Sequence, residues 1–428
     1  MAGKKDMAGY FPVRTVKRAI AAVFLVGIVV GFLGEQHAWS QAAKSSAAPY
    51  ASIAKDGESY AGPGGSAAYD VRGPVLRIGL LAALHGPGKP DGAAMVAAAR
   101  LALRNLSARL PSGQRMELVV GDESGPSWGH VAKAVMQLAL EHNSLVLITP
   151  ESGAEAHLTE QVGNRLGIPV LTISGDPTTT EGDIPWIFRL GASDHAEARE
   201  ILQTMHGGAG SMLLVAEKDE DGVEGARAVD ESARKAGLPV PASVMLDPLR
   251  PDYSSVVQRL TRGHFQALVV WTRAATAGAL LKRLRAAGIS IPTYLSQQAA
   301  QPQSGFGFPL SGDGGRAMGA SESVLAPKNT GASQSARSTF IRQYVKTTGI
   351  LPSPAALEIY DAVQLTVRAV QAVGPNRDRI RKYLAGVQNF HGVSGAISFD
   401  SQGNCRTRLR LMHLIEEEQR PATGDMHE

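Results

Sequence analysis

The sequence predicts an α/β fold with parallel sheets, divided between two lobes. Short apolar runs alternate with segments of helical period from Pro74 onward. Aromatic residues make up only 5% of the chain, whereas there are 47 glycines and 24 prolines. This turn-rich composition is more typical of layered α/β folds than of aromatic-rich β-sandwiches. Because the apolar runs are continuous, each strand is expected to be buried on both faces of its sheet.

The expected strands follow one another along the chain, most of them separated by a helix. The first, 75–84, precedes the loop 86–92 and a helix whose apolar residues recur at helical spacing up to Leu106. Further strands are expected at 116–122, 144–150, 168–174, 211–217 and 266–272. These strands exceed what one small sheet needs, so two lobes are expected. In parallel sheets ligands bind at the carboxyl ends of the strands, which makes the loops after these segments the candidate site.

Residues 1–40 have the composition of a signal peptide. Basic residues precede an apolar run of 15 residues at 19–33, and a small-x-small triplet predicts cleavage before Gln41. The apolar run is shorter than the roughly 20 residues of a membrane-spanning helix. An uncleaved anchor, which would leave the protein tethered to the membrane, is the alternative, and both interpretations place the body of the protein outside the cytoplasm. Residues 41–73 are expected to form a flexible leader and 417–428 a C-terminal tail.

Charge and cysteine content exclude several classes of protein. The formal net charge is +4, and residues 1–40 contribute +3 of it from five basic and two acidic residues, which leaves +1 for the remainder. This balance lacks the basic surface of a nucleic-acid-binding protein. The single cysteine, Cys405, excludes an internal disulfide framework and any Cys-x-x-Cys zinc or redox site.

Motifs of cofactor-dependent and metal-dependent enzymes are missing from the sequence. The segment around Gly88-Lys89 lacks the first glycine of a phosphate-binding loop, and Asp91 occupies the third glycine position of a dinucleotide fingerprint. There is no His-Glu-x-x-His and no Gly-x-Ser-x-Gly motif, and the 11 histidines show no ligand spacing. We therefore expect no cofactor, no metal site and no catalytic residue.

Six segments, taken in their order along the chain, resemble the type I periplasmic binding proteins, in the branch that binds branched-chain amino acids (Leu/Ile/Val). The most specific is 390–404, which contains Gly-x-x-Gly-x-Ile-x-Phe-Asp-x-x-Gly. The other segments are 77–106, 117–127, 164–180, 252–271 and 352–374. Together they extend over about 74–415, nearly the whole body of the chain.

The resemblance implies two Rossmann-like lobes joined by a three-crossover hinge, with a ligand cleft between them. Residues 74–190 and 322–389 would form the proximal lobe, and 191–321 and 390–416 the distal lobe. The family delivers small-molecule solutes to an inner-membrane ABC permease. A monomer or weak dimer is expected here.

The resemblance also implies ligand-binding residues in two loops of the proximal lobe. In the amino-acid binders, Ser and Thr hydroxyls and backbone N–H groups hold the ligand carboxylate. The matching residues here are Thr172 and Ser174 in one loop, and Ser152 with Gly153 in the other.

Two further polar residues follow expected strands. His85 lies at a strand end, where a hydrogen-bonding loop residue is a better interpretation than a catalytic base. Asp176 precedes Pro177 and Thr178, a pattern that fits a helix N-cap and also a ligand contact at a helix start. Both interpretations of Asp176 stay open.

The sequence departs from the family at three ligand positions. Two positions that usually carry Tyr before a Gly are acidic here, namely Asp91 before Gly92 and Asp221 before Gly222. The acid that receives the amino group in the family corresponds to Gln298, a neutral amide without a charge-assisted bond to offer. Either the register is displaced by a residue or two and both Asp residues are solvated, or the ligand is a cation or polyol rather than a branched-chain amino acid.

Three tryptophans, Trp128, Trp186 and Trp271, are candidates for ligand stacking or for core packing.

The leading hypothesis is an exported, non-enzymatic solute-binding protein that does not take a standard branched-chain amino acid. A ligand-sensing or accessory periplasmic protein of the same fold is the second hypothesis. An exported α/β hydrolase, which would depend on a nucleophile such as Ser174, is the third and lacks a nucleophile motif.

Overall fold

The computed structural model describes residues 69–106, 110, 113–125, 128–182, 184–204, 211–301, 306–307, 322–327, 331–406, 409–413 and 415–416. The predicted signal peptide and C-terminal tail, and the predicted leader up to residue 68, lie outside these residues. Within them, no helix combines the length and the hydropathy that crossing a membrane requires.

The first lobe is built on a five-stranded sheet of order β2-β1-β3-β4-β5, in which every pairing is parallel. Its strands are β1 (Val75–Ala82), β2 (Arg115–Asp122), β3 (Val146–Thr149), β4 (Val170–Thr172) and β5 (Ile187–Arg189). Its helical segments are α3 (Lys89–Asn105), α4 (Trp128–Met136), the π-helical turn η2 (Gln137–Glu141), α5 (Gly153–Leu166), α6 (Thr178–Glu181), α11 (Gly331–Thr348), α12 (Pro354–Val373) and α13 (Arg377–Ala385).

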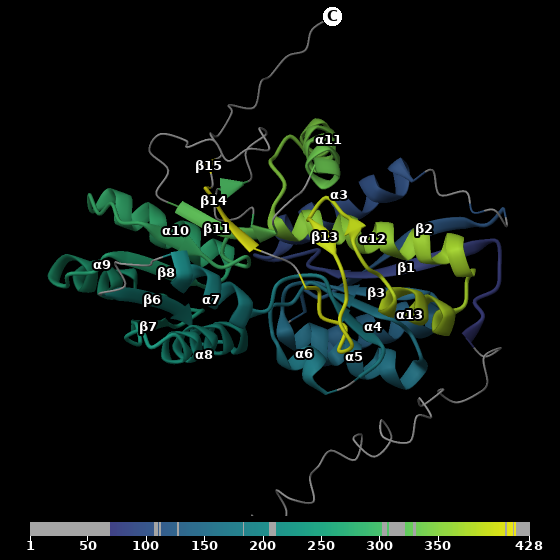
Figure 1. The fold of residues 1–428 in the computed structure, drawn as a ribbon, viewed down its shortest axis with the longest axis horizontal. Coiled ribbons are helices and arrows are strands. Elements are labelled where there is room, and N and C mark those ends of the chain that lie inside the picture. The colour runs from purple at the N-terminus through teal and green to yellow at the C-terminus, as the bar shows by residue number, and fades with distance from the viewer. Residues whose placement is uncertain are drawn as a thin grey trace, which may run out of the picture. The chain divides into compact units, whose positions relative to one another are not determined.

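Both faces of this sheet are covered. Helices α3 and α12 lie on one face and α4 and α5 on the other (Figure 1), and each face packs into its own set of buried apolar side chains. Leu80 contributes to one set and the next residue, Leu81, to the other. This alternation is the reason why β1 is apolar along nearly its whole length.

The second lobe is built on a six-stranded sheet of order β14-β11-β9-β8-β6-β7. Its strands are β6 (Met212–Glu217), β7 (Ala242–Leu246), β8 (Ala267–Trp271), β9 (Thr293–Leu295), β11 (Glu322–Pro327) and β14 (Leu409–His413), of which only β14 pairs in antiparallel fashion. The helices that accompany it are α7 (Asp194–Thr204), α8 (Glu220–Lys235), α9 (Tyr253–Arg262) and α10 (Ala274–Ala286). Two short pairs, β10 (Phe306–Gly307) with β15 (Ile415–Glu416) and β12 (Phe390–His391) with β13 (Ala396–Ile397), complete the described strands.

The predicted fold class is confirmed: two lobes, each a largely parallel sheet flanked by helices. The described elements pass between the sheets three times, after Arg189, after Pro327 and after Arg406. Two segments belong to a different lobe from the one that the sequence analysis expected. Strand β11 pairs with β9 in the second sheet, and 390–406 contacts the first lobe. We therefore propose 74–191 with 331–406 as one lobe and 192–327 with 409–416 as the other.

The predicted leader ends in packed structure rather than in a flexible segment. Tyr69 and Val71 are buried, and Asp70 pairs with Asn376 at the start of α13. Trp186 is also buried, and its ring lies 5.6 Å from the Tyr69 ring between centroids. Trp186 is thus a core residue, and its stacking interpretation is wrong. The side chain of Trp128 lies outside the described residues.

Two glycines occupy matching positions in the two lobes. A Cβ on Gly92, in the first turn of α3, would lie 2.0 Å from the carbonyl oxygen of Ala83. A Cβ on Gly222, in the first turn of α8, would lie 2.3 Å from the carbonyl oxygen of Glu217. In each lobe the helix start therefore packs directly on the end of the first strand, and the preceding Asp91 and Asp221 occupy equivalent positions.

Replacing Gly92 by Ala is expected to lower the free energy of unfolding by about 1–3 kcal/mol, because the new methyl group meets a backbone carbonyl that cannot rotate away. Gly182→Ala is the matched control, since its Cβ would meet nothing closer than 3.5 Å. Urea unfolding followed by circular dichroism measures both. Equal stability of the two variants would contradict the proposed close packing.

Candidate functional site

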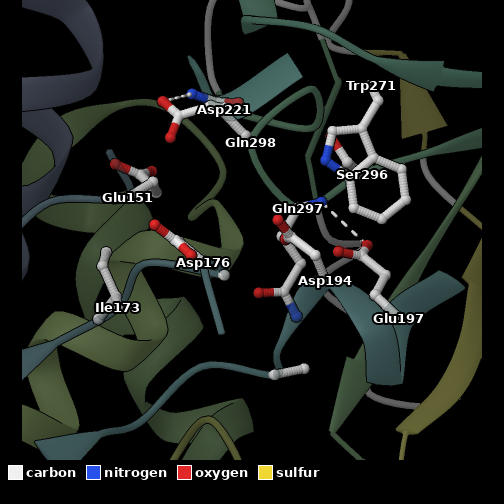
Figure 2. A pocket seen from close by; sticks show the side chains of 12 residues that line it. Glu151, Ile173, Asp176, Asp194, Glu197, Asp221, Trp271, Ser296, Gln297 and Gln298 are labelled. Carbon is white, nitrogen blue, oxygen red and sulfur yellow. Dashed lines mark hydrogen bonds between the residues drawn. The ribbon is translucent and has the colours of Figure 1, made fainter. Parts of the chain in front are cut away.

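A cavity lies where the carboxyl ends of both sheets meet. It holds about 390 Å³ of space not filled by protein atoms, part of it open to solvent. Its lining comes from Glu151, Ile173, Gly175, Asp176, Ala192, Asp194, Glu197, Asp221, Trp271, Ser296, Gln297 and Gln298. Figure 2 shows these side chains around the cavity. Most of them follow strands β3, β4 and β9 or lie in the first turns of α7 and α8, and Trp271 is the last residue of β8, as the topology of parallel sheets predicts.

Asp221 connects the two lobes at this cavity. Its Oδ1 accepts a hydrogen bond of 2.9 Å from the backbone N–H of Gly153, which begins α5 in the other lobe. Its Oδ2 accepts a longer bond of 3.4 Å from the Gln298 amide. The backbone N–H of Asp194 in turn donates to the carbonyl of Gly175 across the chain crossing.

Five carboxyl groups line the cavity, and none of its described lining residues is basic. The negative charge of Asp176 is balanced by His157, whose Nε2 lies 3.1 Å from Oδ2 of Asp176. Burial alone would raise the pKa of Asp176, but hydrogen bonds from His157 and Thr178 lower it to about 2. The same bond, with a second from His157 to the carboxylate of Glu160, raises the pKa of His157 to about 10. Asp176 and His157 therefore form a charged pair near neutral pH.

The other four carboxyl groups have raised pKa values. Burial, with repulsion from Asp91, raises the pKa of Glu151 to about 8. Burial, with repulsion mainly from Asp221, raises the pKa of Asp194 to about 7.

Burial likewise raises the pKa of Asp221 to about 7, with repulsion from Asp219 and Glu155. Burial and the neighbouring Asp194 raise the pKa of Glu197 well above its usual range, although its Oε1 accepts a bond of 3.0 Å from the N–H of Gln297. These groups hold or share protons near neutral pH and ionise when a positive charge is placed among them.

Two of these carboxyl groups lack protein partners. Asp194 is only 9% exposed, and no described residue donates a hydrogen bond to its carboxylate or forms an ion pair with it. Oε1 of Glu151 is enclosed and has no hydrogen-bond partner. Buried polar atoms are nearly always satisfied in proteins, so these oxygens point to a ligand that supplies donors. No group of three His, Cys, Asp or Glu side chains in the described chain is arranged to hold a metal ion.

Of the nine predicted ligand residues, the structure places Asp176, Asp221 and Gln298 on the cavity, and Gly153 in contact with Asp221. Asp176 also accepts hydrogen bonds from the N–H and hydroxyl of Thr178, so it both lines the cavity and organises the start of α6.

The remaining five predicted residues lie outside the lining. Asp91 is in the first turn of α3, close enough to raise the pKa of Glu151, and Ser152 precedes α5. The Thr172 hydroxyl accepts from Thr149, and the Ser174 hydroxyl accepts from the N–H of Asp176. His85 is exposed and hydrogen-bonds Asp122.

Sequence reasoning missed Glu151, Asp194 and Glu197 as site residues. The available signal was position alone: Glu151 follows β3, and the other two lie one turn apart after the chain crosses between lobes. Trp271 was weighed for stacking and for packing; the packing is confirmed, and stacking on a ligand stays a prediction. Trp271 lines the cavity and packs against Gly225, where a Cβ would lie 2.0 Å from its Nε1.

Comparisons with known proteins agree with this architecture. A family model described as periplasmic binding protein matches residues 75–417. The fold is similar to that of a branched-chain amino acid transporter substrate-binding protein from Streptococcus pneumoniae, solved with isoleucine (TM-score 0.66, 17% identity, covering 80% of this chain and 97% of that one).

It is also similar to a Rhodopseudomonas palustris BisB5 solute-binding protein of an ABC transporter, solved with 3,4-dihydroxybenzoic acid (TM-score 0.67, 15% identity, 80% and 93% covered). A solute-binding protein from R. palustris solved with benzoate gives TM-score 0.67 at 19% identity with the same coverage. At such identities the likeness concerns the fold alone. No curated protein sequence matches the chain.

The raised carboxyl pKa values predict how stability depends on pH. Because the folded protein binds more protons than the unfolded chain at Glu151, Asp194 and Asp221, the free energy of unfolding should fall as pH rises from about 5 to about 8. Thermal unfolding of the ligand-free protein across this range measures the effect. Asp194→Asn should flatten the profile and raise the midpoint at pH 8 by a few degrees, whereas the exposed control Glu141→Gln should not. A midpoint that rises steadily from pH 5 to pH 8 would contradict the assignment.

Proposed function

The chain belongs to the periplasmic binding protein family, and we propose from this that it captures a small polar solute between its two lobes and delivers it to an inner-membrane ABC permease. Export to the periplasm by the N-terminal segment, with cleavage before Gln41, is part of the proposal. The role is binding without chemical turnover. Ser174, the nucleophile that a hydrolase would need, is fully buried with its hydroxyl engaged by a backbone N–H, which does not favour catalysis there.

The observation that carries the proposal is the polar cavity between the lobes. Eight of its twelve lining residues supply a carboxyl, amide or hydroxyl group, and the exceptions are Ile173, Gly175, Ala192 and Trp271. Small-molecule sites are concave and carry a few polar groups that fix the orientation of the ligand, as this one does.

The same lining argues against a branched-chain amino acid. A bound amino acid brings a carboxylate as well as an ammonium group, and no described lining residue is positively charged. The hydroxyls of Thr172 and Ser174, expected to hold that carboxylate, lie outside the cavity lining, where they accept internal hydrogen bonds. Aromatic carboxylates would meet the same repulsion from the acidic side chains.

A thermal-shift screen of the protein purified after export tests the function. Leucine, isoleucine, valine and benzoate should leave the midpoint unchanged, whereas a true ligand at a hundredfold excess over its dissociation constant stabilises the fold by about 2.7 kcal/mol. Uptake of that ligand should be lost from cells that lack the protein and restored by its expression. Stabilisation by branched-chain amino acids would show that the departures at Asp91, Asp221 and Gln298 do not alter the ligand. If no solute in a broad library binds, the transport role itself fails.

A further inference from the structure

We propose that the ligand is a small organic cation with two ammonium groups, a diamine, held by carboxylates that both lobes contribute to the cavity. This inference rests on the proposed solute-binding function. It names the class of solute that the cavity takes.

The first carboxylate pair bridges the lobes. Glu151 follows β3 of the first lobe, and Asp221 lies in the first turn of α8 in the second. Figure 2 places both along the same side of the cavity. Both side chains line the cavity, and repulsion from Asp221 adds to the burial and the repulsion from Asp91 that raise the pKa of Glu151. An ammonium group between them would satisfy the enclosed Oε1 of Glu151 and leave the bond from Gly153 to Asp221 in place.

The second pair lies on α7. Asp194 and Glu197 are three residues apart on this helix, a spacing that puts both side chains on one helix face. Both are buried and both line the cavity. Asp194 has no hydrogen-bond donor in the described chain, and only one oxygen of Glu197 receives a donor that the structure places, the N–H of Gln297. A second ammonium group has three N–H donors, which would supply the hydrogen bonds that these carboxyl oxygens lack.

The charged groups around these pairs do not supply a substitute cation. Arg189 attracts Asp194 at longer range, but its guanidinium donates to the carbonyl of Asp176 and to Asn404. His157 is committed to Asp176 and Glu160. The remaining neighbours of the pairs, Asp91, Asp219, Glu155 and Glu358, are acidic and add to the negative potential.

A ligand with two positive charges and no negative one fits this lining better than the alternatives. A neutral polyol would bring no positive charge to stabilise the ionised form of the buried carboxyl groups. A basic amino acid would bring a carboxylate into a cavity whose described lining offers no base to receive it. Trp271 adds an aromatic surface beside the carboxylates, which favours cations further.

Isothermal titration with 1,4-diaminobutane, butylamine and 1,4-butanediol tests the proposal with three ligands of nearly equal length. The diamine should bind at least about tenfold more tightly than the monoamine, because only it reaches both carboxylate pairs, and the diol should not bind. Near pH 7 the diamine should release protons, measured as a dependence of the apparent enthalpy on the ionisation enthalpy of the buffer.

Two isosteric variants locate the pairs. Asp194→Asn and Glu151→Gln should each weaken diamine binding by about tenfold or more and reduce the preference over butylamine, since each removes one charge partner. Glu141→Gln, an exposed acid on η2, is the control and should bind as the parent does. Circular dichroism confirms that each variant is folded before titration.

Three outcomes would overturn the diamine proposal. Equal affinity for butylamine and the diamine would show that the second carboxylate pair does not bind the ligand. Diamine binding without proton release would show that the buried carboxyl groups do not ionise on binding. Tight binding of a polyol or a metal ion in place of the amines would refute the cation class while leaving the solute-binding function intact.

Discussion

The burial of several carboxyl groups in one cavity, without bases to match them, is the constraint on which the rest of the site depends. Removing a carboxylate from water costs several kcal/mol unless a partner or a proton compensates. Asp176 has such a partner in His157. Glu151, Asp194, Glu197 and Asp221 have no such basic partner, and burial raises the pKa of each of them toward or above neutral pH. The ligand-free site therefore lowers the stability of the fold, and such costs are concentrated at functional sites.

The fold places these groups with little freedom to avoid one another. The ends of β3 and β4 in the first sheet and of β9 in the second lead to the cavity, and the close approach of Gly92 and Gly222 fixes the helix starts that follow β1 and β6. Each lobe carries an acidic residue immediately before that glycine. Of these two acids only Asp221 lines the cavity, and the other carboxyl groups follow β3 and β4 or lie on α7, so the acidity of the cleft arises from several strand ends and helix starts.

The sequence was sufficient for the fold class, for the first strands of both lobes and for three of the cavity residues. Strands such as Ile187–Arg189 and Thr293–Leu295 escaped prediction because three residues show no measurable period, and Ala242–Leu246 because it is only partly buried. Asp194 and Glu197 escaped because nothing local marks a helix residue as facing a cavity made by another lobe. The roles of Thr172 and Ser174 in ligand binding stay predictions, and their internal hydrogen bonds depend on contacts that no sequence pattern reveals.

The distribution of the carboxyl groups over two lobes has a consequence for closure. Glu151 belongs to one lobe and Asp194, Glu197 and Asp221 to the other, so bringing the lobes together without a ligand concentrates like charge or binds protons. A cation removes that repulsion only when both sets of carboxylates reach it. Because a ligand shifts a conformational equilibrium by its differential affinity for the two states, a cation held from both sides favours the closed arrangement far more than the open one. Protons compete for the same oxygens, so by reciprocity a lower pH should weaken binding of the proposed cation to the extent that its binding expels protons.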